Sequence, residues 1–160
     1  MTIIKKAKIN DAANIAKMAV ALLKYHANFD PYFAPINDAE NIYAKYFKKC
    51  IYSPTKQLLV AECDGKLAGY ALIEITSRPP VFKVKNMGLV NDIFVVAKFR
   101  RKGVGKELFI GMLDWIKSKK PGYKSLDYIE LSVNIKDIIS QKAWAKYGFK
   151  EYISKQRMKI

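Results

Sequence analysis

Cysteine and histidine are scarce in this sequence of 160 residues, which contains two cysteines and one histidine. Cys50 and Cys63 are too few and too far apart in the sequence to predict a disulfide framework or a cysteine-rich zinc site. His26 is the single histidine, so we expect no histidine-based metal site either. The sequence therefore predicts a reduced protein that holds no metal.

Long hydrophobic runs are also absent. No segment approaches the roughly 20 apolar residues that a membrane-spanning helix needs. The first residues, Met1 to Lys6, lack the apolar stretch of a signal peptide. We therefore expect a cytoplasmic protein without a membrane partner.

Acidic residues are few: the sequence has 14 aspartates and glutamates and 29 lysines and arginines, which gives a net charge of +15. Such an excess is typical of nucleic-acid binding, of attraction to an anionic ligand, or of a solvated lysine-rich surface. The basic residues are spread along the whole sequence without a basic tail. A nucleic-acid partner is therefore the less favoured of these alternatives.

The sequence has no internal repeat, low-complexity segment or linker, so we expect a single domain over residues 1–160. Hydrophobic residues make up 51% of the chain, which is enough for a sizeable core at this length. Periodicity and turn residues predict strands at 2–8, 57–62, 66–75, 87–96 and 126–133, helices at 12–27, 39–50, 104–120 and 135–147, and closing strands at 149–153 and 157–160. Asp64-Gly65 predicts a tight hairpin.

The stretch from Val90 to Leu108 carries the clearest chemical signal. An apolar, β-branched run leads into a basic turn with Gly103 and Gly105, and then into an amphipathic helix. The first-turn N–H groups of a helix have no partner within the helix and lie at the positive end of its dipole. The stretch therefore predicts a pyrophosphate site. It matches neither the Walker pattern nor the dinucleotide fingerprint, since Leu108 stands at the third glycine of the latter.

Residues 100–105 resemble the Arg/Gln-x-x-Gly-x-Gly/Ala motif of the GNAT superfamily of acetyl-CoA-dependent N-acetyltransferases. A second block is similar to the later motif of that family: Leu131-Ser132-Val133, then Trp144, then Gly148-Phe149. The resemblance implies an α/β (α+β) fold with a mixed, mostly antiparallel sheet flanked by helices, in the order β-α-α-β-β-β-α-β-α-β(β). It also implies that the strands at 87–96 and 126–133 splay apart around the acyl-pantetheine arm.

The cofactor residues that this resemblance implies lie on the strand, the basic turn and the last helix. They are Phe94, Val95, Val96, Arg100, Arg101, Lys102, Gly103, Val104, Gly105, Lys106, Asp137, Ser140 and Trp144. The cosubstrate is acetyl-CoA, and backbone N–H groups around Val95 and Val96 are expected to polarise the thioester carbonyl.

Proton transfer needs a base and an acid. Asp92 is the first candidate for the base, with Glu130, Glu74 and ordered water as alternatives. The tyrosine that the family usually places before the Gly-Phe pair is replaced by Trp144, whose indole cannot act as a phenol does. Tyr147 is the candidate for a replacement acid, and a role in core packing is the alternative.

An acceptor amine suits an aromatic and acidic cluster, through cation–π and ion-pair contacts. Such a cluster follows the first predicted helix and comprises Tyr25, His26, Asp30, Tyr32 and Phe33, with core packing as the alternative role. The predicted function is acetyl transfer from acetyl-CoA to a primary amine of a small molecule or peptide. The alternatives are a CoA-binding GNAT-fold protein with little catalysis and a basic nucleic-acid-binding module. The oligomeric state, including a homodimer, is left open.

Overall fold

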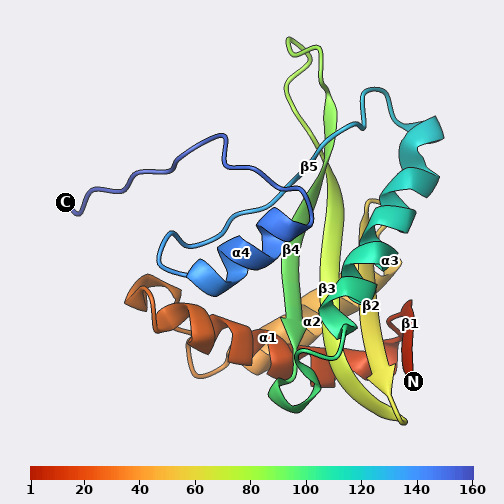
Figure 1. The fold of residues 1–160 in the computed structure, drawn as a ribbon, viewed down its shortest axis with the longest axis vertical. Coiled ribbons are helices and arrows are strands. Elements are labelled where there is room, and N and C mark those ends of the chain that lie inside the picture. Colours follow the sequence, from red (N-terminus) through yellow and green to blue (C-terminus); the bar gives the residue numbers. More distant parts are fainter.

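A five-stranded sheet forms the centre of the computed structural model, which describes all 160 residues (Figure 1). The strands lie side by side in chain order: β1 (Thr2–Lys6), β2 (Lys56–Cys63), β3 (Lys66–Ser77), β4 (Asn86–Val95) and β5 (Ile129–Glu130). Each of β1 to β4 is antiparallel to its neighbours in this group, whereas β5 joins β4 in parallel. The predicted mixed, mostly antiparallel sheet is therefore confirmed.

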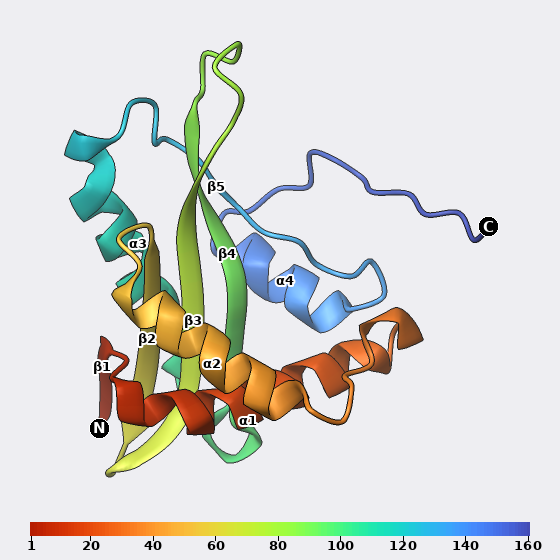
Figure 2. The same cartoon turned by 180° about the vertical axis from the view of Figure 1, so that it is seen from behind.

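Helices cover both faces of the sheet. α1 (Ala12–Ala27) and α2 (Ala39–Tyr52) lie on one face (Figure 2), and α3 (Val104–Lys119) lies on the other. One core cluster of 13 buried residues joins α1 and α2 to β2 and β3, and a second of 14 joins α3 to the sheet. α4 (Ile138–Lys146) lies beside β4, beyond the end of β5. No helix combines the length and the apolar character that crossing a membrane requires.

The β2–β3 hairpin forms as the sequence predicts. Asp64 and Gly65 have φ angles of 49° and 74°, which are the left-handed values that a two-residue primed turn requires. Aspartate and glycine tolerate these values better than most residues, so the turn follows from the local sequence. The register shifts beyond the turn, where a bulge leaves Ala68 without a partner in β2.

A bulge in β4 sets the direction of the residues that follow it. Leu72 of β3 lies opposite Asp92 and Ile73 lies opposite Val90, so Asn91 has no partner in the ladder. The extra residue reverses the alternation, because Val90 belongs to the core on the α3 side while Phe94 packs against the core on the α1–α2 side. Asp92 shares the face of Phe94 and therefore points toward α1 and α2.

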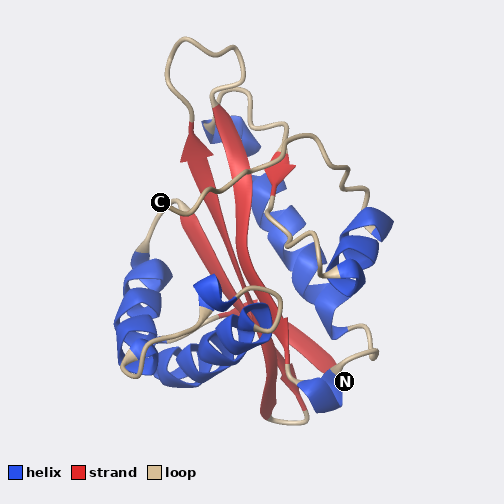
Figure 3. Cartoon of the chain, turned by 90° about the vertical axis from the view of Figure 1, so that its left-hand side faces the viewer, coloured by secondary structure: helices blue, strands red, loops and turns tan.

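The contact between β4 and β5 is short, as Figure 3 shows. Only Gly88 with Ile129 and Leu89 with Glu130 are paired, and the two segments then diverge. The divergence that the family resemblance implies is thus present. The predicted strand at 126–133 is reduced to two residues because the rest of the segment has no partner to complete a ladder.

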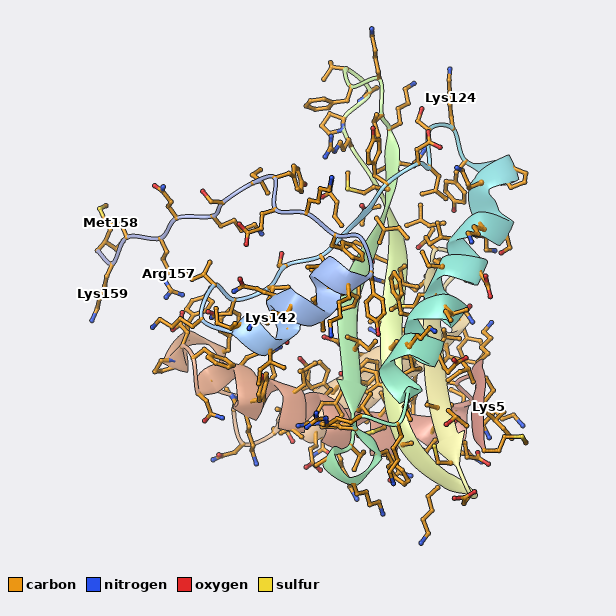
Figure 4. All side chains as sticks on the ribbon, in the orientation of Figure 1. Lys5, Lys124, Lys142, Arg157, Met158 and Lys159 are labelled. Atoms are coloured by element: carbon orange, nitrogen blue, oxygen red, sulfur yellow. The ribbon has the colours of Figure 1, made fainter.

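The predicted closing strands at 149–153 and 157–160 are wrong. Residues 149–160 form no regular element, and every residue from 150 onward is exposed. A strand needs a neighbouring ladder and a surface on which to bury one face. This charged segment has neither, and Figure 4 shows Arg157, Met158 and Lys159 on an extended chain that leads away from the sheet.

Candidate active site

The turn that joins β4 to α3 presents a series of unpaired backbone N–H groups. None of the N–H groups of residues 101–106 donates a hydrogen bond within the protein, and the next one, from Glu107, reaches the carbonyl oxygen of Gly103 at 3.1 Å. These groups lie at the N-terminus of α3, whose 16 residues add the positive end of a helix dipole. The turn can therefore bind an anionic group of the size of a pyrophosphate.

The backbone of this turn depends on glycine at one position and leaves space at another. Gly103 has a φ of +83°, and Arg101 before it has a φ of 60°, so the chain passes twice through the left-handed region. Gly105 has no such requirement, and a Cβ added there would meet only Val95 Cγ2, at 3.8 Å. The space beside Gly105 is therefore open to a ligand.

The basic side chains of the turn take different positions. Arg100 folds back onto β4, where its Nε donates to the carbonyl oxygen of Val95 at 2.8 Å and its guanidinium lies 5.6 Å from the Phe94 ring centroid. Arg101, Lys102 and Lys106 are exposed around the turn. Val104 is buried and anchors the first turn of α3 in the core.

A cavity of about 250 Å³ lies between the end of β4 and α4. It is lined by residues of α1, β4, the segment after β5 and α4, namely Leu22, Tyr25, His26, Val90, Asn91, Asp92, Ile93, Phe94, Val95, Arg100, Leu131, Ser132, Val133, Asp137, Ile139, Ser140 and Trp144. Six predicted cofactor residues are among them: Phe94, Val95, Arg100, Asp137, Ser140 and Trp144.

The two predicted carbonyl-polarising N–H groups differ in availability. The N–H of Val96 donates to the carbonyl oxygen of Ala68 at 2.9 Å, within the β3–β4 ladder. Because successive N–H groups of a strand point to opposite edges, the N–H of Val95 points away from β3, toward the cavity. Val95 is therefore the available donor of the pair.

Asp137 ties α4 to α1. It is 1% exposed, and its carboxylate accepts hydrogen bonds from the Tyr25 hydroxyl at 3.1 Å, the Ser140 N–H at 3.0 Å and the Ser140 hydroxyl at 2.7 Å. The bond from the Ser140 N–H is the N-cap of α4. Burial and the hydrogen bond to Asp137 raise the pKa of Tyr25, so its phenol stays protonated.

Tyr147 takes a different position from that of Tyr25. Its ring stacks on Phe109 of α3, with centroids 4.6 Å apart and an interplanar angle of 25°, and it contacts Trp144 edge-on. Tyr147 does not line the cavity between β4 and α4, and Tyr25 is the one tyrosine that does. Sequence reasoning missed Tyr25 for this position, since the approach of α1 to α4 leaves no local sequence signal.

A larger cavity of about 610 Å³ lies on the α1–α2 side of β4. Its lining residues are Leu23, Ala34, Pro35, Ile36, Ala39, Ile42, Tyr43, Tyr46, Asn91 and Asp92. Asn91 and Asp92, at the β4 bulge, line both this cavity and the smaller one. We call this bulge the junction, because its residues border both cavities.

Asp92 is the acidic residue at this junction that lacks a cationic partner. Burial raises the pKa of its carboxyl group above the ordinary range, and Tyr70 acts in the opposite direction. The hydroxyl of Tyr70 is buried and has no partner at hydrogen-bond geometry. A half-buried carboxylate with a raised pKa can accept a proton at neutral pH more readily than an exposed one.

The other two candidate bases are neutralised by basic residues. Glu74 forms an ion pair with Lys56 and accepts a hydrogen bond from the Asn91 side chain at 2.9 Å. Glu130 pairs with Arg78 at 3.0 Å. The Asn91 contact also fixes the bulge, so Glu74 holds the residue next to Asp92.

The predicted acceptor cluster is divided between two regions. Tyr25 and His26 line the smaller cavity, and burial lowers the pKa of His26, which favours the neutral imidazole. Asp30 pairs with Arg157 at 2.6 Å, and the Arg157 guanidinium lies 4.7 Å from the Tyr32 ring centroid. Phe33 contacts the rings of Tyr32 and His26. Asp30, Tyr32 and Phe33 line neither cavity.

Sequence reasoning missed the walls of the larger cavity. The sequence predicted a helix at 39–50 but no ligand-binding role for Tyr43, Tyr46, Pro35 or Ile36. Ile42 is 51% exposed, so this face of α2 is not fully covered.

Basic side chains lie on several sides of the molecule. Figure 4 shows Lys5, Lys124 and Lys142 on different sides of the molecule, with Lys159 on the C-terminal segment. No group of three or more histidine, cysteine or carboxylate side chains is placed to hold a metal ion.

Comparison with known proteins identifies relatives of this chain. The model of the acetyltransferase (GNAT) family matches residues 23–149. A protein of Archaeoglobus fulgidus named an uncharacterized N-acetyltransferase is 30% identical over 70 residues, which are 44% of this chain and 47% of that protein. The chain thus spans about half the length of this curated relative.

Solved structures share the whole fold at low sequence identity. A mutant of the BH1408 protein from Bacillus halodurans gives a TM-score of 0.86 at 17% identity, over 99% of both chains. A predicted acetyltransferase from Clostridium acetobutylicum, solved with acetyl-CoA, gives 0.75 at 16% identity, over 99% of this chain and 96% of that one. AAC(6')-Iy, in complex with a bisubstrate analogue, gives a TM-score of 0.75 at 18% identity, over 100% of this chain and 99% of that one. Because the family model covers most of the sequence, the chain belongs to the GNAT acetyltransferase family.

Proposed function

We propose that this protein transfers the acetyl group of acetyl-CoA directly to the primary amine of a small molecule. The observation that carries the proposal is the junction at the β4 bulge, where Asp92 lines both cavities. A donor in the smaller cavity and an amine in the larger one would meet at this residue. Structural relatives that were solved with acetyl-CoA or with a bisubstrate analogue support the choice of donor.

The turn at residues 101–106 is proposed to hold the pyrophosphate of CoA. Its unpaired N–H groups, the open space beside Gly105 and the exposed charges of Arg101, Lys102 and Lys106 all suit a polyanion. The pantetheine arm would follow the cavity along Phe94 and Val95, with Trp144 on the opposite wall. Asp137 and Ser140 form hydrogen bonds with each other, so we propose that they position α4 rather than contact CoA directly.

The residues of the chain can account for each proton. Acetyl-CoA supplies a thioester whose C–S bond breaks as the C–N bond of the amide forms. Asp92, in its ionised form, would accept a proton from the ammonium group and free the nitrogen lone pair for attack. The N–H of Val95 would stabilise the developing charge on the carbonyl oxygen. The nitrogen loses a second proton after attack, and one proton ends on the thiolate while the other leaves to solvent.

The proposal is tested by mixing the protein with acetyl-CoA and a set of primary amines and measuring free thiol. We expect thiol release that depends on the amine and matches the amount of N-acetylated product by mass spectrometry. Thiol release at the same rate without an amine would show a hydrolase instead. Tight CoA binding without release would favour the alternative of a binding protein with little catalysis.

The phenol that faces the smaller cavity yields a further prediction. We propose that the Tyr25 hydroxyl, which lies beside Asp137, donates the proton that ends on the CoA thiolate. Replacing Tyr25 with phenylalanine removes this proton donor and should lower kcat by about tenfold or more. Tyr147→Phe is the matched control, because its hydroxyl does not line the cavity, and kcat should stay within about twofold of the wild-type value. Steady-state kinetics of both variants measure the two kcat values. A larger fall of kcat in Tyr147→Phe than in Tyr25→Phe would assign the acid to Tyr147.

A further inference from the structure

The wall of the larger cavity is mostly apolar. Seven of its ten lining residues are hydrophobic, and they come from α1, from the loop before α2 and from α2 itself. Leu23, Pro35 and Ile36 form one side of this wall, and Ile42 and Tyr43 lie on α2. Asn91 and Asp92 supply an amide and a carboxylate at the inner end, and Tyr43 and Tyr46 add neutral phenol groups on α2. The cavity therefore offers an apolar surface to most of a bound molecule and a charge to one end.

The aromatic part of this wall is rigid. Tyr43 stacks on Phe47 with ring centroids 5.4 Å apart and an interplanar angle of 12°, and Phe47 is fully buried against Tyr70. Tyr46 also contacts Phe47, with ring centroids 5.4 Å apart, and its ring lies 6.5 Å from that of Tyr43. Burial raises the pKa of Tyr43, so its phenol is neutral. A preformed aromatic wall binds a flat or branched apolar group with little ordering cost.

The mouth of the cavity is apolar as well. Ile36 is 66% exposed and Ile42 is 51% exposed, and both line the cavity. A hydrophobic rim of this kind gains free energy when an apolar ligand covers it.

The charge of the cavity is limited to one carboxylate. Asp92 lines it, whereas the carboxylate of Glu74 behind the bulge is paired with Lys56 and that of Asp30 with Arg157. The protein carries a net charge of +15, which repels a polycation approaching from solvent. One ammonium group can be compensated here, whereas a second or third would face apolar walls.

We infer that the acceptor is a small primary amine with a single positive charge and an apolar, preferably aromatic, body. This inference rests on the proposed function, since it assigns a substrate class to the same site. The single carboxylate and the net positive charge disfavour polyamines and aminoglycosides as acceptors, although one structural relative is an aminoglycoside N-acetyltransferase. The ammonium group lies beside Asp92, and the apolar body lies along α2 toward Ile36 and Ile42.

The test compares amines at fixed acetyl-CoA. We expect kcat/KM for 2-phenylethylamine and isoamylamine to exceed that for ethanolamine by about 100-fold, because the apolar body leaves water only in the first two. Spermidine and neamine should give kcat/KM values at least about tenfold below that of 2-phenylethylamine. Equal or higher values for either polycation would overturn the inference and leave the proposed function intact.

A charge variant tests the position of the apolar body. Ile42→Glu places a second carboxylate on the exposed rim and should lower kcat/KM for 2-phenylethylamine and raise it for spermidine, each by about fivefold. Ile110→Glu makes the same change on α3, at a residue that is 38% exposed and lines neither cavity, and should alter neither value. If the ratio of kcat/KM for 2-phenylethylamine to kcat/KM for spermidine is unchanged in Ile42→Glu, the acceptor binds elsewhere.

A binding measurement separates the two proposals if no amine is acetylated. Calorimetric titration of 2-phenylethylamine into CoA-saturated protein should show binding that Ile42→Glu weakens and Ile110→Glu does not. Binding without turnover would reject the catalytic proposal and keep the inferred ligand class. Absence of binding, together with absence of turnover, would reject the inference.

Discussion

Replacing Asp92 with asparagine is expected to lower kcat by about 10²–10⁴-fold, the range typical of a lost general base. The amide has the shape of the carboxylate but accepts no proton at neutral pH. Because burial raises the pKa of Asp92, the acidic limb of the wild-type rate profile should lie above the ordinary aspartate range, and the variant should lose this limb. The measurement is kcat against pH for both proteins.

The same substitution should not destabilise the fold at neutral pH. The folded-state pKa of Asp92 lies above its ordinary value of 3.8, so the protonated carboxyl is favoured in the folded protein. Stability from this group is present below 3.8 and is lost as the pH rises through the raised folded-state pKa. At pH 7 the folded wild type holds a buried, ionised carboxylate, which lowers its stability, and the neutral asparagine of the variant does not have this effect. Its melting temperature should therefore equal or exceed that of the wild type.

Asp127→Asn provides the matched control for the Asp92 experiment. Asp127 is an exposed aspartate that pairs with Lys120 at 2.9 Å and lines neither cavity, so both kcat and its pH profile should be unchanged. A wild-type acidic limb that persists in Asp92→Asn would mean that ordered water or another group removes the proton.

Replacing Gly105 with aspartate should weaken acetyl-CoA binding by at least about 100-fold, which corresponds to about 2.7 kcal/mol. The new carboxylate would occupy the open space beside the unpaired N–H groups and repel the pyrophosphate. An aspartate in the first turn of a helix is itself favourable, so the unliganded protein should keep its melting temperature. Calorimetric titration of acetyl-CoA measures the loss.

Gly105→Ala is the control for this substitution, because its Cβ would meet only Val95 Cγ2, at 3.8 Å, and it adds no charge. We expect the alanine variant to keep most of its affinity. Gly103 is a poorer position for this test, since its φ of +83° would strain any other residue and mix folding with binding. Equal affinity of Gly105→Asp and wild type would show that the pyrophosphate binds elsewhere.

The sequence predicted the backbone geometry of the proposed pyrophosphate turn, because every requirement for that geometry is local. A strand, a left-handed glycine and a helix start at Val104 follow one another within 19 residues of chain, and each leaves its own signature. The Asp64-Gly65 hairpin was predictable for the same reason.

The features that the sequence could not supply depend on contacts between distant segments. The bulge at Asn91 has no compositional mark, yet it directs Asp92 toward α2 rather than α3. The position of Tyr25 depends on α1 reaching Asp137, 112 residues further along the chain. Periodicity correctly predicted a helix at 39–50, which contains Tyr43. It could not show that the space beneath is only partly filled.

The closing strands failed for a related reason. Apolar residues at 149–153 and 157–160 form a strand only where a sheet edge receives them. The β4–β5 pairing ends after two residue pairs, and no edge of sufficient length is left beside this segment.

The melting temperature of the wild-type protein with and without acetyl-CoA tests the central claim, that this fold holds acetyl-CoA for transfer. A ligand that binds only the folded state stabilises it by mass action. At a concentration about 100 times the dissociation constant, we predict a rise of about 5–10 °C, and no comparable rise in Gly105→Asp. An unchanged melting temperature of the wild type at millimolar acetyl-CoA would contradict the account.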